Sequence, residues 1–213
     1  MALRGGASGG RSAGGRQEPR QAIAASPAAV SAAHDHDAAS AWVARFASLV
    51  SAGGRVVDLA CGRGRHARFF AARGCQVVAI DRDTAALAAI RGIEGVTPIV
   101  ADLESAPWPA DIGSFDAIIV TNYLHRALFA NILGALTEDG ILIYETFARG
   151  NERYGKPSNP DYLLAPGELL AQIGATLTVI AFEQGMSGGA TPSVIQRIAA
   201  VGPARAWPPP LPP

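Results

Sequence analysis

The stretch that decides the fold reads VVDLACGRGRH and runs from Val56 to His66. A short apolar and β-branched run ends in Asp58, and Gly62 and Gly64 follow within six residues. This pattern predicts a strand over residues 55–60 and a helix over residues 64–73. Glycine at such a turn lets the backbone approach a ligand closely, because no Cβ stands in the way. The stretch therefore predicts a ligand-binding turn between a strand and a helix.

The same alternation of strands and helices extends over most of the chain. Further helices are predicted at residues 38–50, 83–91, 125–137 and 166–173. Further strands are predicted at residues 75–80, 97–101, 115–121, 140–146, 175–183 and 193–201. Strands without polar alternation are buried on both faces, which is typical of a parallel sheet. The fold class is therefore α/β, a doubly wound, mostly parallel, seven-stranded, Rossmann-like sheet that ends in a C-terminal antiparallel hairpin.

Composition limits the domain organisation to one domain. Of the 213 residues, 49% are hydrophobic and 17% are charged, and the formal net charge is zero. Residues 1–36 are rich in Gly, Ser, Ala and Arg and are expected to be a disordered extension. Residues 37–203 should form the domain, and residues 204–213 a proline-rich tail. A neutral chain does not coat nucleic acid through bulk charge, so a nucleic-acid partner is not expected.

Cysteine use and the lack of a long apolar run predict a cytoplasmic protein. Cys61 and Cys75 fall well over ~10 Å apart if they lie at opposite ends of neighbouring strands, too far for a disulfide. No apolar run reaches the ~18 residues of a membrane span. The HDHD run at residues 34–37 is too compact for its side chains to converge on one ion, so no metal is predicted.

Acidic residues end three consecutive predicted strands: Asp58, Asp81 and Asp102. In a doubly wound sheet, ligands bind beyond the carboxyl ends of the strands, where the strand order reverses. Asp58 suits an ammonium group, since a loop that holds pyrophosphate offers bare N–H groups instead. Asp81 suits ribose hydroxyls, and Asp102 suits the amino group of adenine. S-adenosylmethionine carries all three groups, so the sequence predicts a site for this cofactor.

From Trp42 to Val201 the chain resembles the class I S-adenosylmethionine-dependent methyltransferases, and in detail the small bacterial tellurite-resistance-type branch. The resemblance rests on VVDLACGRGRH, VVAID, ADLESAPWP, FDAIIVTNYLHR and EDGILIYETF, with GNERYGKPSNPDYLLAPGELL as a branch-specific block. It implies transfer of the cofactor's methyl group, with S-adenosylhomocysteine as the product. The family often has glycine at the position of Ala60, and a methyl group there is small enough for cofactor binding to survive.

These motifs give the candidate cofactor site. Its expected residues are Asp58, Ala60, Cys61, Gly62, Gly64, Asp81, Arg82, Asp102, Leu103 and Asn122. Cys61 and His66 are interpreted mainly as packing residues beside this site.

The acceptor side is expected from the loops after the fourth and fifth strands. Tyr123, His125 and Arg126 are the candidate catalytic residues. The candidate substrate-binding residues are Arg126, Arg153, Tyr154 and Lys156. Cations at one pocket mouth attract anions, so we expect a small polar or anionic acceptor, methylated by in-line displacement. In the alternative interpretation these cations pair with neighbouring acids and only pin the loop.

Two other functions compete with this hypothesis. Gly62, Gly64 and Ala67 also fit the G-x-G-x-x-A pattern of an NAD(P)-dependent oxidoreductase, although Asp58 does not suit a pyrophosphate site. A methyltransferase acting on RNA or protein is the other alternative. The partner expected is a small-molecule acceptor, with no membrane, and the oligomeric state is left open.

Overall fold

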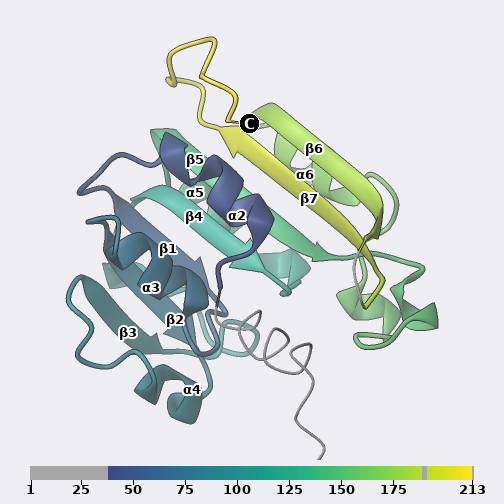
Figure 1. Ribbon diagram of the computed structural model, residues 1–213, viewed down its shortest axis with the longest axis horizontal. Helices are drawn as coiled ribbons and strands as arrows, with labels where there is room; N and C mark the ends of the chain where they lie inside the picture. The colour runs from purple at the N-terminus through teal and green to yellow at the C-terminus, as the bar shows by residue number, and fades with distance from the viewer. Residues whose placement is uncertain (1–37, 189–190, 213) are drawn as a thin grey trace, which may run out of the picture.

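The computed structural model describes residues 38–188 and 191–212. The predicted extension at residues 1–36 and the HDHD run at residues 34–37 lie outside the described residues. A seven-stranded sheet forms the centre of the molecule, in the order β3-β2-β1-β4-β5-β7-β6 (Figure 1). Its strands are β1 Arg55–Leu59, β2 Gln76–Asp81, β3 Val96–Val100, β4 Phe115–Thr121, β5 Leu136–Phe147, β6 Thr178–Ser187 and β7 Ser193–Val201.

The pairing of the strands confirms the predicted fold class. The strands β1 to β5 run parallel, and β7 is antiparallel to both β5 and β6. From β1 the chain proceeds to β2 and β3 on one side of the sheet, and then returns to β4 and β5 on the other side of β1. The carboxyl ends of β1, β2 and β4 therefore meet at a topological switch point, where open α/β sheets bind their ligands.

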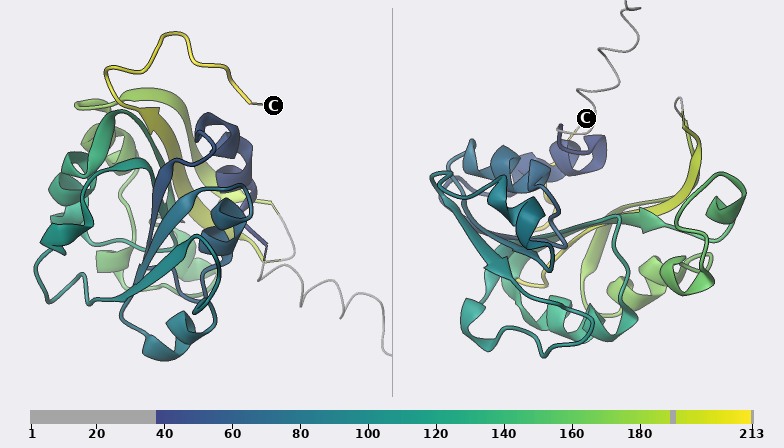
Figure 2. Two further views of the ribbon diagram at one scale, coloured as in Figure 1. Left: turned by 90° about the vertical axis from the view of Figure 1, so that its left-hand side faces the viewer. Right: turned by 90° about the horizontal axis from the view of Figure 1, so that it is seen from below.

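Two layers of helices cover the sheet (Figure 2). The helices α2 Ala41–Phe46, α3 Arg65–Ala71 and α4 Thr84–Ala88 bury Trp42, Phe70 and Leu87 against one face. The helices α5 Phe129–Gly134 and α6 Glu168–Gly174 bury Phe129 and Leu169 against the other. Short 3-10 turns lie at η1 Ala47–Leu49, η2 Ala110–Ile112, η3 Arg126–Leu128, η4 Asn151–Arg153 and η5 Pro160–Tyr162. In the part of the chain that the structure describes, no helix has the length and apolarity to cross a membrane.

Several predicted elements differ from the observed ones at their ends, among them β5, which begins at Leu136, four residues earlier than predicted. The helix predicted at residues 125–137 is divided into η3 and α5 and ends at Gly134, because Leu136 already pairs with Phe115 in the sheet. The first strand of the C-terminal hairpin lies at Thr178–Ser187, three residues later than predicted, whereas β7 has the predicted bounds. Pairing with a neighbouring strand therefore decides these boundaries, and local sequence patterns do not contain that information.

The C-terminal tail packs back onto the domain instead of leaving it. The Arg205 guanidinium donates to the carbonyl oxygen of Leu49 at 2.7 Å and to that of Asp139 at 2.9 Å. Ala204 N–H also donates to the carbonyl of Glu138 at 2.8 Å. The start of the predicted tail thereby joins η1 to the start of β5.

We expect Arg205→Ala to lower the free energy of unfolding by about 1–2 kcal/mol, because two carbonyl groups lose a charged donor. Urea unfolding followed by circular dichroism measures this change. Arg91→Ala removes an exposed arginine elsewhere and should change the free energy of unfolding by less than about 0.5 kcal/mol. Equal stability of the two variants would show that the docked tail does not support the domain.

Candidate cofactor and acceptor site

Two residues other than glycine, one alanine and one asparagine, have a left-handed backbone beside the switch point. Ala60 follows β1 with φ of 52°, and Asn122 follows β4 with φ of 54°. This conformation costs a residue with a Cβ roughly 1–2 kcal/mol, and such strain concentrates at functional sites. The left-handed backbone also explains why the family, which this chain resembles, often has glycine at this position, where this chain has Ala60.

The glycine loop is held by hydrogen bonds from two sides. Gly62 N–H donates to Asp81 Oδ2 at 2.7 Å, and Gly64 N–H donates to the carbonyl of Cys61 at 2.9 Å. A Cβ on Gly64 would lie 2.5 Å from Cγ2 of Ile90, whereas a Cβ on Gly62 would meet no atom of the described residues within 4 Å, apart from its own chain neighbours. The two glycines therefore have different roles, since Gly64 allows close packing and Gly62 leaves open space at the crevice.

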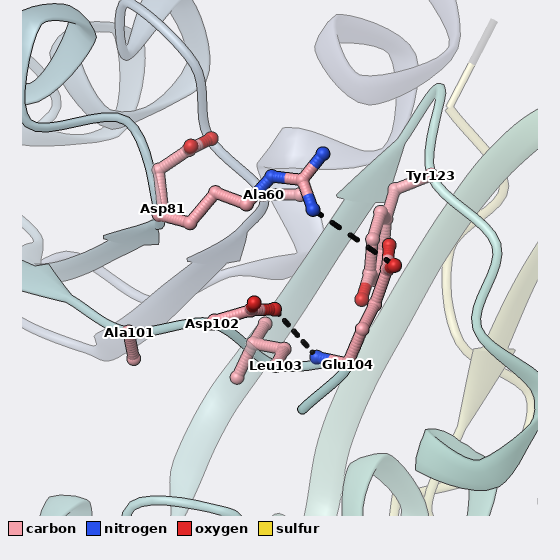
Figure 3. A pocket seen from close by; sticks show the side chains of 8 residues that line it. Ala60, Asp81, Ala101, Asp102, Leu103, Glu104 and Tyr123 are labelled. Atoms are coloured by element: carbon pink, nitrogen blue, oxygen red, sulfur yellow. Dashed lines mark hydrogen bonds and ion pairs between the residues drawn. The ribbon is translucent and has the colours of Figure 1, made fainter. Parts of the chain in front are cut away.

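A crevice lies beyond the carboxyl ends of the strands and consists of two cavities that share Ala60. We call the cavity of about 200 Å³ the acidic half; it is lined by Ala60, Asp81, Arg82, Ala101, Asp102, Leu103, Glu104 and Tyr123 (Figure 3). We call the cavity of about 310 Å³ the basic half; it is lined by Ala60, Cys61, Gly62, Arg63, Arg65, His66, Thr121 and Asn122. Eight of the ten residues predicted for the cofactor site line one half or both, and Asp58 and Gly64 do not.

Carboxylates of Asp81 and Asp102 organise the acidic half. Asp81 accepts the N–H groups of Gly62 and Asp83, the latter at 2.8 Å. Asp102 accepts the N–H of Glu104 at 3.0 Å and the hydroxyl of Ser105 at 2.8 Å, and these bonds lower the pKa of Asp102. Each carboxylate oxygen has two lone pairs, so both side chains retain acceptor capacity toward a ligand.

Tyr123 forms the opposite wall of the acidic half (Figure 3). Its hydroxyl oxygen is buried and has no hydrogen-bond partner among the described residues. Burial is the main cause that raises the pKa of Tyr123, so the hydroxyl keeps its proton. Tyr123 can therefore donate a hydrogen bond to a ligand but cannot remove a proton near neutral pH, and a catalytic role for it stays a prediction.

Asp58 supports the loop from beneath instead of facing the crevice. Its side chain is 1% exposed, and Oδ2 accepts the N–H of Ala67 at 3.1 Å. Burial raises the pKa of Asp58 from 3.8 to about 7, and Oδ1 has no partner among the described residues. The geometry therefore supports a role in holding the start of α3, and direct contact with an ammonium group stays a prediction.

His66 connects this loop to the N-terminal helix, a contact that the sequence did not predict. Its Nε2 accepts the N–H of Ser40 at 3.2 Å, which requires an unprotonated nitrogen. Burial lowers the pKa of His66 to about 3, in agreement with a neutral ring. The proton then lies on Nδ1, which is 3.4 Å from Oγ1 of Thr121 and 3.9 Å from Asp58 Oδ1. The contact with Asp58 is therefore not an ion pair at neutral pH.

Arg126 is engaged in stabilising the loop that follows β5. Its guanidinium donates to both carboxylate oxygens of Glu168, at 2.6 and 3.0 Å, and to the carbonyls of Asp161 and Leu163, at 2.6 and 3.0 Å. These four bonds support the alternative in which the cation pins the loop. The carboxylate that pairs with it is Glu168, at the start of α6. His125 precedes η3 and lines neither half of the crevice.

The other predicted acceptor residues lie away from the crevice. Arg153, Tyr154 and Lys156 are exposed and line neither half. A bridge between Ala148 and Leu164 closes the base of their loop. Inside the loop, the buried Asn151 side chain donates to the carbonyl of Pro157 and accepts the N–H of Val194. The structure therefore does not bring these side chains to the place where the cofactor residues meet.

Comparisons with known proteins agree with the fold. Residues 56–140 match a family described as a methyltransferase domain. A search of curated protein sequences found no match. TehB from Haemophilus influenzae has a TM-score of 0.64 at 16% identity, and the match covers 75% of this chain and 61% of TehB. A TehB-like S-adenosylmethionine-dependent methyltransferase from Corynebacterium glutamicum has a TM-score of 0.59 at 17% identity, covering 82% of this chain and 95% of that one.

A third similar structure contains a product of the cofactor. The glycopeptide N-methyltransferase MtfA, complexed with S-adenosylhomocysteine, has a TM-score of 0.55 at 21% identity, and the match covers 76% of this chain and 88% of MtfA. Residues 56–140 therefore match a methyltransferase domain, and the chain as a whole shares the fold of these S-adenosylmethionine-dependent methyltransferases. The similarity to TehB extends over only 61% of the length of TehB and is a similarity of fold.

The two glycines can be separated by mutation. Gly64→Ala should lower the free energy of unfolding by about 2–4 kcal/mol, because a left-handed backbone and a clash with Ile90 add together. Gly62→Ala should cost only about 1–2 kcal/mol, since open space surrounds the added methyl group. Calorimetric titration should instead show at least fivefold weaker binding of S-adenosylhomocysteine to Gly62→Ala. Equal losses of stability in both variants would contradict this division of roles.

We expect Asp58→Asn to stabilise the protein at pH 8 by up to about 4 kcal/mol and to have little effect at pH 4. The unfolded state loses the proton of Asp58 near pH 3.8, whereas the folded state keeps it until about pH 7. The contribution of Asp58 to the free energy of unfolding of the wild-type protein therefore falls as the pH rises between these two values. Asparagine has no charge to lose or gain, and its amide oxygen can still accept the N–H of Ala67. Urea unfolding at both pH values measures the difference.

Asp116→Asn is the matched control for this experiment, because Asp116 also accepts one backbone N–H, that of Arg55 at 2.7 Å, but is only partly buried. A similar gain in both variants would show that general charge reduction, and not the burial of Asp58, causes the stabilisation.

Proposed function

We propose that the protein transfers the methyl group of S-adenosylmethionine to a small polar or anionic acceptor. The observation that carries this proposal is the division of the crevice at Ala60 into an acidic and a basic half. Acids that accept hydrogen bonds suit the hydroxyl and amino groups of adenosine. Bare backbone N–H groups of the glycine loop suit the carboxylate of the methionine moiety. The cofactor would therefore lie across Ala60, with its sulfur near the boundary.

In the acidic half, Asp81 would accept hydrogen bonds from the ribose hydroxyls, and Asp102 would accept one from the adenine amino group. Leu103 is buried beside Asp102 and offers an apolar surface for the adenine ring. The Tyr123 hydroxyl, which lacks a partner among the described residues, would donate to a ring nitrogen or to the acceptor.

The remaining work of the chain is to position the acceptor and exclude water. When bound, the sulfonium supplies an electrophilic methyl group: the acceptor's lone pair forms the new bond as the carbon–sulfur bond breaks, and that bond's electron pair stays on sulfur. Neither Tyr123 nor His125 is placed as a base, so an acceptor that already presents a free lone pair is favoured. Soft anions and thiolates fit this requirement, which agrees with a TehB-like branch.

The function is tested in two stages. Calorimetric titration with S-adenosylmethionine, S-adenosylhomocysteine and NADH should show micromolar binding of the two sulfur compounds only. A screen with thiols, tellurite, selenite, tRNA and protein lysate fractions should then show release of S-adenosylhomocysteine with a small acceptor. Turnover with tRNA or protein alone would replace the proposed acceptor class. Location in the cytoplasm stays a prediction outside this test.

Asp81→Asn should weaken binding of S-adenosylhomocysteine at least tenfold. An amide offers one acceptor oxygen in place of two charged ones, so Gly62 N–H and the ribose hydroxyls compete for it. Asp83→Asn is the matched control, because Asp83 caps α4 through the N–H groups of Ala85 and Ala86 and does not line the crevice. Calorimetric titration of both variants measures the dissociation constants, and an unchanged constant for Asp81→Asn would move the ribose contact elsewhere.

A further inference from the structure

The basic half of the crevice carries positive charge that the described protein does not neutralise. Arg63 and Arg65 line it, and none of its eight lining residues is acidic. Among the described residues, neither guanidinium has a carboxylate within 4.0 Å. Asp58 lies beneath this half, but burial raises the pKa of its carboxyl to about 7, so it is only a partial counter-charge at neutral pH.

Arginines that stabilise the fold are paired in a different way. Arg126 forms two bonds to Glu168, Arg197 contacts Glu183 and Glu145, and Arg205 donates to two backbone carbonyls. The side chains of Arg63 and Arg65 have no such partners in the described chain, yet they lie where the glycine loop meets the crevice. Arg63 is exposed and Arg65 is half-buried, so both guanidinium groups are accessible to a ligand in this half of the crevice.

The cofactor alone does not balance these charges. The methionine end contributes one carboxylate and one ammonium group, and the sulfonium adds another positive charge. With two arginines, the basic half would keep excess positive charge beside the methyl group. An anion bound there would be stabilised by charge-assisted, two-point hydrogen bonds to guanidinium. The cavity of about 310 Å³ must hold both the methionine end and this anion, so the anion has to be small.

We propose that Arg63 and Arg65 form the acceptor site, binding a small carboxylate or oxyanion whose nucleophilic atom then faces the methyl group. This inference rests on the proposed function and deepens it, because it names the acceptor class and its binding residues. It also moves the expected anion site from the loop that carries Arg153 and Lys156 to the glycine loop.

The test uses the full chain saturated with S-adenosylhomocysteine. Calorimetric titration is carried out with selenite, tellurite and 3-mercaptopropionate as anionic probes and with 2-mercaptoethanol as a neutral probe. At least one anion should bind with a submillimolar dissociation constant. If 3-mercaptopropionate is the anion that binds, the neutral 2-mercaptoethanol should bind at least tenfold more weakly. Arg63→Gln and Arg65→Gln should each weaken anion binding at least fivefold, while the dissociation constant of S-adenosylhomocysteine stays within twofold of wild type.

Two further variants locate the effect. Arg91→Gln, at an exposed position away from the crevice, should leave anion binding unchanged, and Arg153→Gln tests the loop after β5. The proposal is overturned if no anion binds to the complex, or if Arg153→Gln is the only variant that weakens anion binding. It is also overturned if the glycine-loop variants lose S-adenosylhomocysteine instead, since both arginines would then serve the cofactor. Failure of wild-type protein to bind S-adenosylhomocysteine would instead refute the proposed function itself.

Discussion

The hydrogen bond from Gly62 N–H to Asp81 is the contact on which the site depends. It joins the loop after β1 to the end of β2 at 2.7 Å, between a backbone donor and a charged acceptor. Beneath the loop, Asp58 accepts the N–H of Ala67 and fixes the first turn of α3. The loop is therefore held by acids from two neighbouring strands, and its free side is turned toward the crevice. A loop that is ordered before binding loses less conformational entropy when a ligand arrives.

Strand order determines the division of charge in the crevice. β2 and β3 lie on one side of β1, and the acids at or just beyond their ends, Asp81 and Asp102, line the acidic half. The glycine loop and the end of β4 line the basic half, where Arg63 and Arg65 are found. Ala60 lies between the two because it follows β1 at the point where the order reverses. One ligand with a neutral, hydroxyl-rich end and a zwitterionic end fits this division.

Polar side chains in and around the crevice have contacts over long sequence distances. Arg126 and Glu168 are 42 residues apart, and His66 and Ser40 are 26 residues apart. A cation after a strand and a histidine after a glycine loop have the same local sequence whether they bind a ligand or a distant protein group. Arg126 illustrates this, because its four hydrogen bonds all go to protein groups and favour the alternative in which it pins the loop, while its role toward a substrate stays a prediction.

The sequence by itself determined the fold class, the seven strands, the free cysteines and the position of the glycine loop and its acids. These features depend on local periodicity, on glycine at left-handed positions and on residues at strand ends, all of which are visible in a single chain. Only the tertiary structure decided that Asp58 faces inward and that Arg126 pins a loop. It also decided that Arg63 and Arg65 line the basic half of the crevice. Burial and pairing depend on which distant elements pack together, and that information lies in the arrangement of the elements and not in their local sequence.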